Sequence, residues 1–348
     1  MKPWLMGCCL LLAAPFLAAA GDQAGSPDNP DLVILYTGNG NAEIEPMGCC
    51  FKTGGMARRA NRIADLRKQH PHLLVVDSGD CLRRKPGDAV YDIRPKHVHR
   101  ALAAIGYDVL NIAGGEMAAG EAFRKLFEND AAMPLVSTNV VSTNPDRKNL
   151  WPAFRLKKAG LVTIGIMGLT KQTEADGFRI AEPEEAVRRW LPAVQKEADI
   201  IVLLSHIGWE KTKEIVQNHP GIHVAIVGYD DYPTFDPETV NDTLIVKNAF
   251  DGGMLGIVEI WLNGERGAPR IQSRLDLLDY RIPVKREYTD LESNFRAEKK
   301  AFEAELKKRA AEQNKQRELA RYLHMSPEQF MEYMKKNNGR LDQKVDNP

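Results

Sequence analysis

The sequence has no excess charge of either sign, because 47 lysine and arginine residues balance 47 aspartate and glutamate residues among its 348 residues. It therefore lacks the basic surplus by which proteins attract nucleic-acid polymers or anionic membranes, and partners must be inferred from individual sites. It also lacks internal repeats. Hydrophobic residues make up 43% and charged residues 27%, which excludes a disordered or fibrous chain and predicts one large domain with an appendage.

A secretory signal peptide is predicted at the N-terminus. An apolar run from Trp4 to Ala20 follows a lysine and ends in three alanines, so residues 1–20 are expected to be removed. This run is at the short limit for a retained transmembrane anchor. Lipidation at Cys8 is a lesser alternative, because almost no hydrophobic segment precedes it. We therefore expect an exported protein, periplasmic or extracellular, with no membrane span after cleavage and with residues 21–30 as a linker.

Short apolar runs rich in valine, isoleucine and leucine alternate with helical patterns along most of the chain. The runs predict strands that are buried on both faces, at residues 32–36, 73–77, 109–112, 135–136 and 200–205. Apolar residues at spacings of three and four predict helices between them, with further helices at residues 184–198 and 209–218. This alternation predicts an α/β fold of βαβ units around a largely parallel sheet.

The later part of the chain is expected to be more antiparallel. Runs at residues 243–247, 256–262 and 274–280 follow one another with only short turns, and the main domain is expected to span residues 31–282. Residues 283–348 shift to charged helix formers and predict a helical tail. This tail either packs back on the domain, which its narrow apolar stripe favours, or serves as an arm for a protein partner. The stripe consists of Leu291, Phe295, Phe302 and Leu306.

Polar residues follow three of the predicted strands. Asn39 and Asn41 follow the first, Asp77 and Asp80 the second, and His206 the run at 200–205. Ligands of α/β sheets bind beyond the carboxyl ends of the strands, so these side chains are expected to converge. A buried strand that delivers the Asp-Ser-Gly-Asp segment through a glycine turn could hold a hard cation rigidly. The same aspartates could instead cap a helix or organise the turn.

Six short motifs succeed one another between residues 36 and 231. They are Tyr36-Thr37-Gly38-Asn39-Gly40-Asn41, Gly54-Gly55-Met56-Ala57-Arg58-Arg59, Asp77-Ser78-Gly79-Asp80, residues 111–120, Ser205-His206-Ile207-Gly208 and Gly228-Tyr229-Asp230-Asp231. In this order they resemble the motifs of metallophosphatases of the 5′-nucleotidase type, in the calcineurin-like phosphoesterase superfamily. The resemblance implies a metallophosphatase-type β-sandwich flanked by helices.

The same resemblance implies two divalent metals that orient a water or hydroxide for attack on a phosphate ester. Its bridging aspartate corresponds to Asp80 and one of its histidines to His206. The first aspartate and first histidine have become Asn39 and Asn41. The implied Gly-Asn-His-Glu motif has an asparagine that ligates metal and a histidine that supports the leaving group. It appears here as Gly114-Gly115-Glu116, with both of those residues missing.

The changed positions weaken the implied metal site. The last histidine pair has become Tyr229 and Asp231, and an amide or phenol is a poor substitute for a charged or imidazole ligand. We expect one divalent metal at most, whose identity the sequence does not specify. Nucleotide specificity is not implied, because the resemblance does not extend to the second, substrate-binding domain of full-length relatives. The candidate ligands are Asp80, His206, Glu116, Asp231, Asn39, Asn41 and Asp77.

The loop that reads Glu-Pro-Met-Gly-Cys and ends at Cys49 looks like that of a closer branch. Exported bacterial 5′-nucleotidase-like proteins of this branch have Glu-Pro-Cys-Gly-Cys there, sometimes with selenocysteine. Cys49, Cys50 and Cys81 remain after signal cleavage and are expected at the same edge. One structural disulfide could tie the loop to the strand end. Alternatively, the thiols bind a soft metal or exchange disulfides.

Arg58 and Arg59 open a predicted helix below a pair of glycines. Exposed amides at a helix start are partly positive, so the two arginines could contact an anion there. A solvated basic edge is the alternative.

Two functional hypotheses follow. The first is an exported 5′-nucleotidase-like phosphoesterase that hydrolyses phosphate esters or nucleotides with a weakened metal site centred on Asp80 and His206. The alternative is an inactive pseudo-phosphatase whose cysteine-lined edge binds soft metal or performs thiol–disulfide chemistry, or which serves as a periplasmic scaffold. The expected partners are a small phosphate ester and a protein that contacts the helical tail.

Overall fold

The computed structural model describes residues 29–128, 130, 133–144, 151–173, 175, 177–229, 236–247, 250–262 and 268–337. The predicted signal peptide, most of the predicted linker and Asp231 lie outside these residues. In the part of the chain that is described, no helix is both long and apolar enough to cross a membrane.

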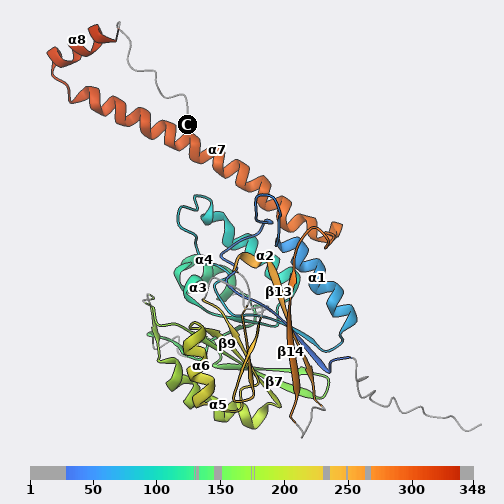
Figure 1. Ribbon diagram of the computed structural model, residues 1–348. Coiled ribbons are helices and arrows are strands. Elements are labelled where there is room, and N and C mark those ends of the chain that lie inside the picture. The colour runs from blue at the N-terminus through green and yellow to red at the C-terminus, as the bar shows by residue number, and fades with distance from the viewer. Residues whose placement is uncertain are drawn as a thin grey trace, which may run out of the picture.

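Two six-stranded sheets form the centre of the domain (Figure 1). The first has the order β14-β13-β1-β2-β3-β4 and consists of Arg270–Leu277, Met254–Trp261, Leu32–Thr37, Leu73–Asp77, Val109–Asn111 and Leu135–Val136. The second has the order β11-β12-β10-β9-β7-β6 and consists of Glu238–Val240, Thr243–Lys247, Val224–Val227, Ile200–His206, Val162–Thr170 and Phe154–Ala159. A small separate pair joins β5 (Val140–Ser142) to β8 (Phe178–Ile180).

The two sheets pack face to face. Successive side chains of each strand point to opposite faces of its sheet, so each strand contributes residues to both faces. In β1, Leu32, Ile34 and Tyr36 join a buried cluster that also contains residues of β7, β9, β10 and β12. Val33 and Leu35 point to the other side and join the cluster beneath the helices. Each central strand is therefore buried on both faces, as its continuous apolar run predicts.

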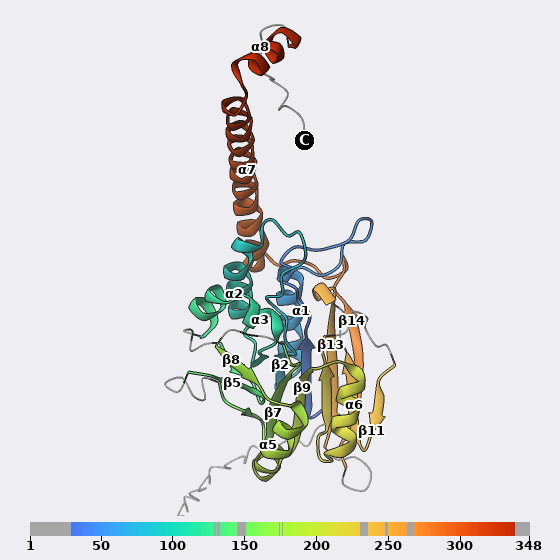
Figure 2. The same cartoon turned by 90° about the vertical axis from the view of Figure 1, so that its left-hand side faces the viewer.

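Helices cover the outer face of each sheet (Figure 2). Those on the first sheet include α1 (Met56–Gln69), α2 (Arg94–Ile105) and the first part of α7 (Arg286–Leu323). Those on the second sheet are α5 (Pro183–Glu197) and α6 (Trp209–Asn218). Shorter helical segments are η1 (Tyr91–Ile93), α3 (Gly114–Ala118), α4 (Glu121–Phe123), η2 (Arg124–Glu128) and η4 (Phe250–Gly252). The predicted α/β sandwich flanked by helices is confirmed.

The expectation of antiparallel pairing late in the chain is right for two strands and wrong for one. β13 pairs antiparallel with both β1 and β14. β12 instead runs parallel to β10, and only the short β11 beside it is antiparallel. β12 has the apolar character of a central strand, because it lies inside the second sheet with its middle residues buried.

The C-terminal helix divides into a packed part and a projecting part. Leu291 and Phe295 are buried against the domain, and Phe302 is packed at the margin of the same cluster. From Glu303 onward most described side chains of α7 are exposed, and the helix extends away from the sheets (Figures 1 and 2). The last helix, α8 (Pro327–Lys336), turns back on α7, where the hydroxyls of Tyr322 and Tyr333 lie 2.9 Å apart.

Candidate functional site

The carboxyl ends of β1, β2 and β9 meet at one end of the sandwich and bring the predicted polar residues together. Asn39, Asn41, Asp80 and His206 are all buried there. Backbone hydrogen bonds join the loops after β1 and β2. One of them runs from the backbone N–H of Asn39 to the carbonyl oxygen of Gly79, at 2.9 Å. The convergence that strand topology predicts is present.

His206 is the centre of this arrangement. Its Nε2 lies 3.2 Å from Oδ1 of Asn39 and 3.5 Å from Oδ2 of Asp80. Oδ1 of Asn39 also accepts the backbone N–H of Tyr229 at 3.0 Å, which fixes the orientation of the amide. Burial lowers the pKa of His206, so the ring is neutral near pH 7. Because Nε2 faces two oxygens, we infer that Nε2 carries the ring proton.

Asp80 is held in place by neighbouring backbone groups. It has a left-handed backbone conformation with φ 62°. Its Oδ1 accepts the N–H of Gly115 at 2.7 Å, and its Oδ2 lies 4.0 Å from the guanidinium of Arg83. The retained carboxylate therefore has one oxygen committed to the protein and one directed at His206 and Arg83.

Asp77 organises the turn rather than facing His206. Its Oδ2 accepts the hydroxyl of Thr37 at 2.5 Å, and its Oδ1 accepts the N–H of Gly79 at 2.8 Å. The Thr37 hydroxyl lies 2.9 Å from the hydroxyl of Tyr107, to which Arg59 donates at 3.3 Å. Burial raises the pKa of Asp77. Both oxygens are engaged, which fits the turn-organising alternative better than metal ligation.

Glu116 is likewise engaged by the backbone. Its Oε2 accepts the N–H groups of Asp80 and Ala113 at 3.0 and 2.9 Å, and its Oε1 accepts that of Leu82 at 3.0 Å. Burial, together with the nearby Asp80 carboxylate, raises the pKa of Glu116 to about 7. Because both oxygens satisfy buried amides, the expectation that Glu116 serves as a metal ligand does not fit its contacts.

The two glycines before Glu116 differ in their surroundings. A Cβ on Gly115 would come within 2.6 to 2.8 Å of N, Cα and Cβ of Arg83, whereas a Cβ on Gly114 would be 4.0 Å from Oδ1 of Asp80. In the motif that this segment resembles, position 115 carries the histidine implied to support the leaving group. Here the Arg83 backbone occupies that space.

Asn41 faces a cluster that the sequence analysis missed. Its Nδ2 donates to Oδ1 of Asp251 at 2.9 Å, and the ammonium of Lys85 lies 2.7 Å from the same oxygen. Lys85 also pairs with Glu43 at 2.9 Å. Asn41 Oδ1 is buried without a hydrogen-bond partner among the described residues. Asp251 belongs to none of the sequence motifs. The only signal in the sequence is the pair of glycines that follows it, directly before β13.

Tyr229 closes the outer side of the site. Its ring contacts that of His206 edge to face, with 5.7 Å between the centroids. Its hydroxyl accepts a hydrogen bond from the ammonium group of Lys171 at 2.8 Å. Tyr229 therefore occupies the neighbourhood expected for the lost histidine. The remaining candidate from that motif, Asp231, lies outside the described residues.

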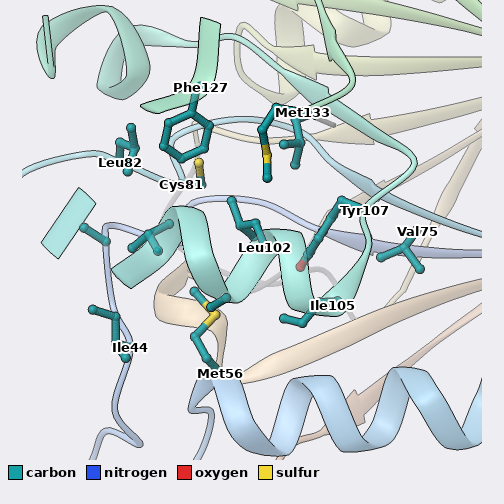
Figure 3. Packing of buried hydrophobic residues seen from close by; sticks show 14 of the residues in the cluster. Ile44, Met56, Val75, Cys81, Leu82, Leu102, Ile105, Tyr107, Phe127 and Met133 are labelled. Carbon is teal, nitrogen blue, oxygen red and sulfur yellow. The ribbon is translucent and has the colours of Figure 1, made fainter. Parts of the chain in front are cut away.

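The three described cysteines are free thiols. Cys81 is buried and points into the core beside Leu82 and Phe127 (Figure 3). Burial raises the pKa of its thiol well above the ordinary value. Cys49 and Cys50 are exposed on the loop between β1 and α1. The expectation of three thiols at one edge is not met, because Cys81 is buried in contact with both Glu116 and the hydrophobic cluster, whereas Cys49 and Cys50 are exposed. No disulfide joins the described cysteines.

Arg58 and Arg59 diverge from the helix start. Arg59 is buried, and its guanidinium lies against Gly252 and Tyr107. Arg58 donates to the carbonyls of Lys52 and Gly54 at 3.1 and 3.3 Å and lines a cavity of about 450 Å³ beside α7. Because Arg59 is held inside the protein by these contacts, the predicted anion contact at the helix start could involve Arg58 alone.

The comparisons with known proteins agree with this fold. No protein-family model matches the chain. The probable 5′-nucleotidase of Treponema pallidum is 31% identical over 221 residues, which are 58% of this chain and 37% of that protein. Over this region the chain is similar in sequence to 5′-nucleotidases. It spans less than half the length of the curated relatives that it matches first, so their complete activity is not transferred with the similarity.

Solved structures share the architecture of this chain. A 5′-nucleotidase precursor from Thermus thermophilus superposes with a TM-score of 0.67 at 18% identity, covering 78% of this chain and 59% of that one. The calcineurin-like phosphoesterase YfkN from Bacillus subtilis gives 0.63 at 19% identity, covering 78% and 98%. At these identities the similarity establishes the metallophosphatase fold.

The metallophosphatase fold implies divalent metal cofactors, and the residues present here fit a metal pair poorly. Among the residues that the structure describes, no three His, Cys, Asp or Glu side chains are grouped so that they could hold an ion. Asp80 and His206 remain, and Nε2 of His206 could ligate in the tautomer that carries the ring proton on Nδ1. Asn39 already accepts bonds from Tyr229 and His206. Asn39, Asp80 and His206 therefore contact one another, and with the inferred tautomer these contacts are hydrogen bonds within the protein.

Proposed function

We propose that this protein is an exported pseudo-phosphoesterase: a 5′-nucleotidase-like domain that no longer performs two-metal hydrolysis of phosphate esters. The observation that carries the proposal is the position of His206 Nε2, between Asn39 Oδ1 at 3.2 Å and Asp80 Oδ2 at 3.5 Å. In a working metal centre that nitrogen would present its lone pair to an ion. In the tautomer inferred above, it presents a proton to these two oxygens instead.

The lost leaving-group position supports the same proposal. The close approach of the Arg83 backbone to Gly115 leaves no room for a side chain where the resemblance implies a catalytic histidine. Restoring that histidine by one substitution would require the segment after Asp80 to move. The site therefore lacks space at the position of that histidine as well as several of the implied ligands.

Positively charged side chains partner the carboxylates whose negative charge a metal ion would otherwise neutralise. Lys85 pairs with Asp251 at 2.7 Å beside Asn41, and the guanidinium of Arg83 lies 4.0 Å from Asp80. A carboxylate that already has a cation as partner gains less from binding a metal. These pairs are expected to lower the affinity of the edge for a divalent ion.

The test combines metal content with hydrolysis. The full chain and its Asp80→Ala variant are assayed with p-nitrophenyl phosphate and with a nucleoside monophosphate, each with added Mn²⁺, and bound manganese is measured on the same samples. Equal, background hydrolysis by both proteins is the expected result. Hydrolysis that requires Mn²⁺ and disappears in Asp80→Ala would sink the proposal.

A single-metal phosphoesterase is the second candidate, favoured by the retention of both Asp80 and His206 in contact with each other. One ion on these two residues would keep open positions for a phosphate oxygen and supply Lewis-acid character. This candidate expects about one manganese per chain. It also expects that His206→Ala removes the ion together with any activity.

The projecting half of α7 is proposed as a contact for a protein partner. Phe295 is buried, so a deletion that tests the arm must begin after the packed residues, and residues 304–348 are suitable. The truncated domain is expected to fold and to lose the partner in a pull-down from an exported fraction. Retention of every co-purifying protein by the truncated domain would contradict the proposal.

A further inference from the structure

Cys49 and Cys50 form a pair of adjacent, exposed thiols that the degenerate phosphoesterase site does not use. Their sulfurs lie 3.7 Å apart on the loop between β1 and α1. The neighbouring Phe51 is 80% exposed, so the tip of this loop is open to solvent on the side of its thiols. Exposed free thiols are unusual on a stable surface and call for a chemical explanation.

The loop is built to present this tip. Met47 and Thr53 exchange two backbone hydrogen bonds of 2.8 Å each, which closes the loop at its base. Gly48 has φ 105°, and a Cβ there would come within 2.3 Å of the carbonyl oxygen of Phe51, so the turn into Cys49 requires glycine. Lys85 donates to the sulfur of Met47 at 3.6 Å and ties the base to the domain.

The spacing of the two sulfurs fits metal chelation better than it fits a disulfide. Two thiolates that share one tetrahedral ion at bond lengths of about 2.3 Å are about 3.8 Å apart. The observed 3.7 Å matches that spacing without rearrangement. A disulfide would need the sulfurs at about 2.05 Å and Cα atoms at least about 4.4 Å apart, whereas residues adjacent across a trans peptide have Cα atoms about 3.8 Å apart.

We propose that Cys49 and Cys50 chelate one soft, thiophilic metal ion through both sulfurs. Ions of this class include Zn²⁺, Cu⁺ and Cd²⁺, which thiolates select over the hard cations of a phosphoesterase centre. Binding releases the thiol protons to solvent, because the ligands are thiolates. Two protein sulfurs leave two tetrahedral positions for water or for a ligand of another molecule, so the site suits capture and transfer of the ion. This proposal is independent of whether hydrolysis is lost.

The test is a titration of the reduced full chain with Cd²⁺ under anaerobic conditions, followed by the sulfur-to-metal charge-transfer absorption. Cys8→Ser and Cys9→Ser are included in every protein so that only the three described thiols respond. The test variants are Cys49→Ser and Cys50→Ser. The controls are Cys81→Ser, which removes the buried thiol, and Asp80→Ala, which alters the phosphoesterase edge.

One Cd²⁺ per chain is expected in the parent and in both controls. Each single loop variant should bind at least about 100-fold more weakly, because the second sulfur of a chelate acts at a high effective concentration. Serine at the exposed tip does not threaten the fold, so a weakened variant cannot be dismissed as unfolded. The proposal is overturned by a change below about tenfold in either loop variant, by one ion per two chains, or by loss of the absorption in Asp80→Ala.

Discussion

Oδ1 of Asn39 lies 3.2 Å from Nε2 of His206, in a position where a metallophosphatase would place a charged ligand beside an ion. The amide is neutral, and it accepts two hydrogen bonds that a carboxylate could also accept. Asparagine and aspartate have nearly the same shape, so the two side chains differ at position 39 mainly by one unit of negative charge.

Asn39→Asp is predicted to make the fold depend on metal. A second buried carboxylate beside Asp80 has no added cation to balance it, so the variant should lose about 1–3 kcal/mol of unfolding free energy in a chelator. Mn²⁺ should restore part of that loss. Thermal unfolding with EDTA and with Mn²⁺ measures both effects, and Asn294→Asp, the same change on an exposed face of α7, is the control. An Asn39→Asp variant as stable as wild type in EDTA would show that the charge is not felt.

The two glycines of α3 predict opposite responses to alanine. Gly115→Ala should cost about 1–3 kcal/mol, because its Cβ would overlap the Arg83 backbone at 2.6 to 2.8 Å. Gly114→Ala should be neutral or slightly stabilising, since its Cβ would stand 4.0 Å from Asp80 Oδ1 and alanine favours a helix. Urea denaturation of the two variants checks the contrast. Equal stability would mean that Arg83 moves aside easily and that the leaving-group position is not closed.

Much of the fold was predictable because its signals are local. The strand ends at Asp80 and His206 converge as parallel topology requires, and the apolar runs of the central strands match their burial on both faces. The partners within the site were less predictable. Asp251 reaches Asn41 from 210 residues away, and the Arg83 backbone closes on Gly115, neither of which follows from spacing in the sequence.

Cys81 shows the same limit from another side. It is next to Asp80 in sequence, which suggested a thiol at the sheet edge, but adjacent residues after a strand can point in opposite directions. Asp80 faces His206, while the buried Cys81 lies in the hydrophobic cluster with its thiol hydrogen-bonded to Glu116 (Figure 3). Only the three-dimensional path of this turn separates the buried thiol from the exposed pair at Cys49 and Cys50.

Glu116 predicts a pH dependence of stability. Its pKa is raised from 4.5 to about 7, first by burial and then by Asp80. For an acid with a raised folded-state pKa, the folded protein keeps a proton that the unfolded chain has already released. The stabilisation that comes from this proton is complete below the pKa of the unfolded chain, 4.5, and is lost as pH rises toward about 7. The unfolding free energy should therefore fall between these two pH values. Urea midpoints from about pH 5 to pH 8 measure this slope.

The matched variant for this slope is Glu116→Gln, which does not titrate. It should be less stable overall, because its NH₂ group would oppose one of the three amides that the carboxylate accepts. Its urea midpoint should nevertheless vary less with pH than that of the wild type over the same range. Parallel pH profiles for the two proteins would assign the slope to another group.

Phe295 and Leu319 lie on the packed and the projecting parts of α7. Alanine substitutions at the two positions test which part of the helix contributes to the stability of the domain. Phe295 is fully buried and meets the ring of His97 edge to face at 5.3 Å, so Phe295→Ala should cost about 3–5 kcal/mol. Leu319 is 49% exposed on the projecting half, and Leu319→Ala should stay within about 0.5 kcal/mol of wild type. Denaturant titration with a domain signal separates the two. A large loss in Leu319→Ala would mean that the projecting half is itself packed in solution, against the domain or a second copy, and the arm would then be unavailable to another protein.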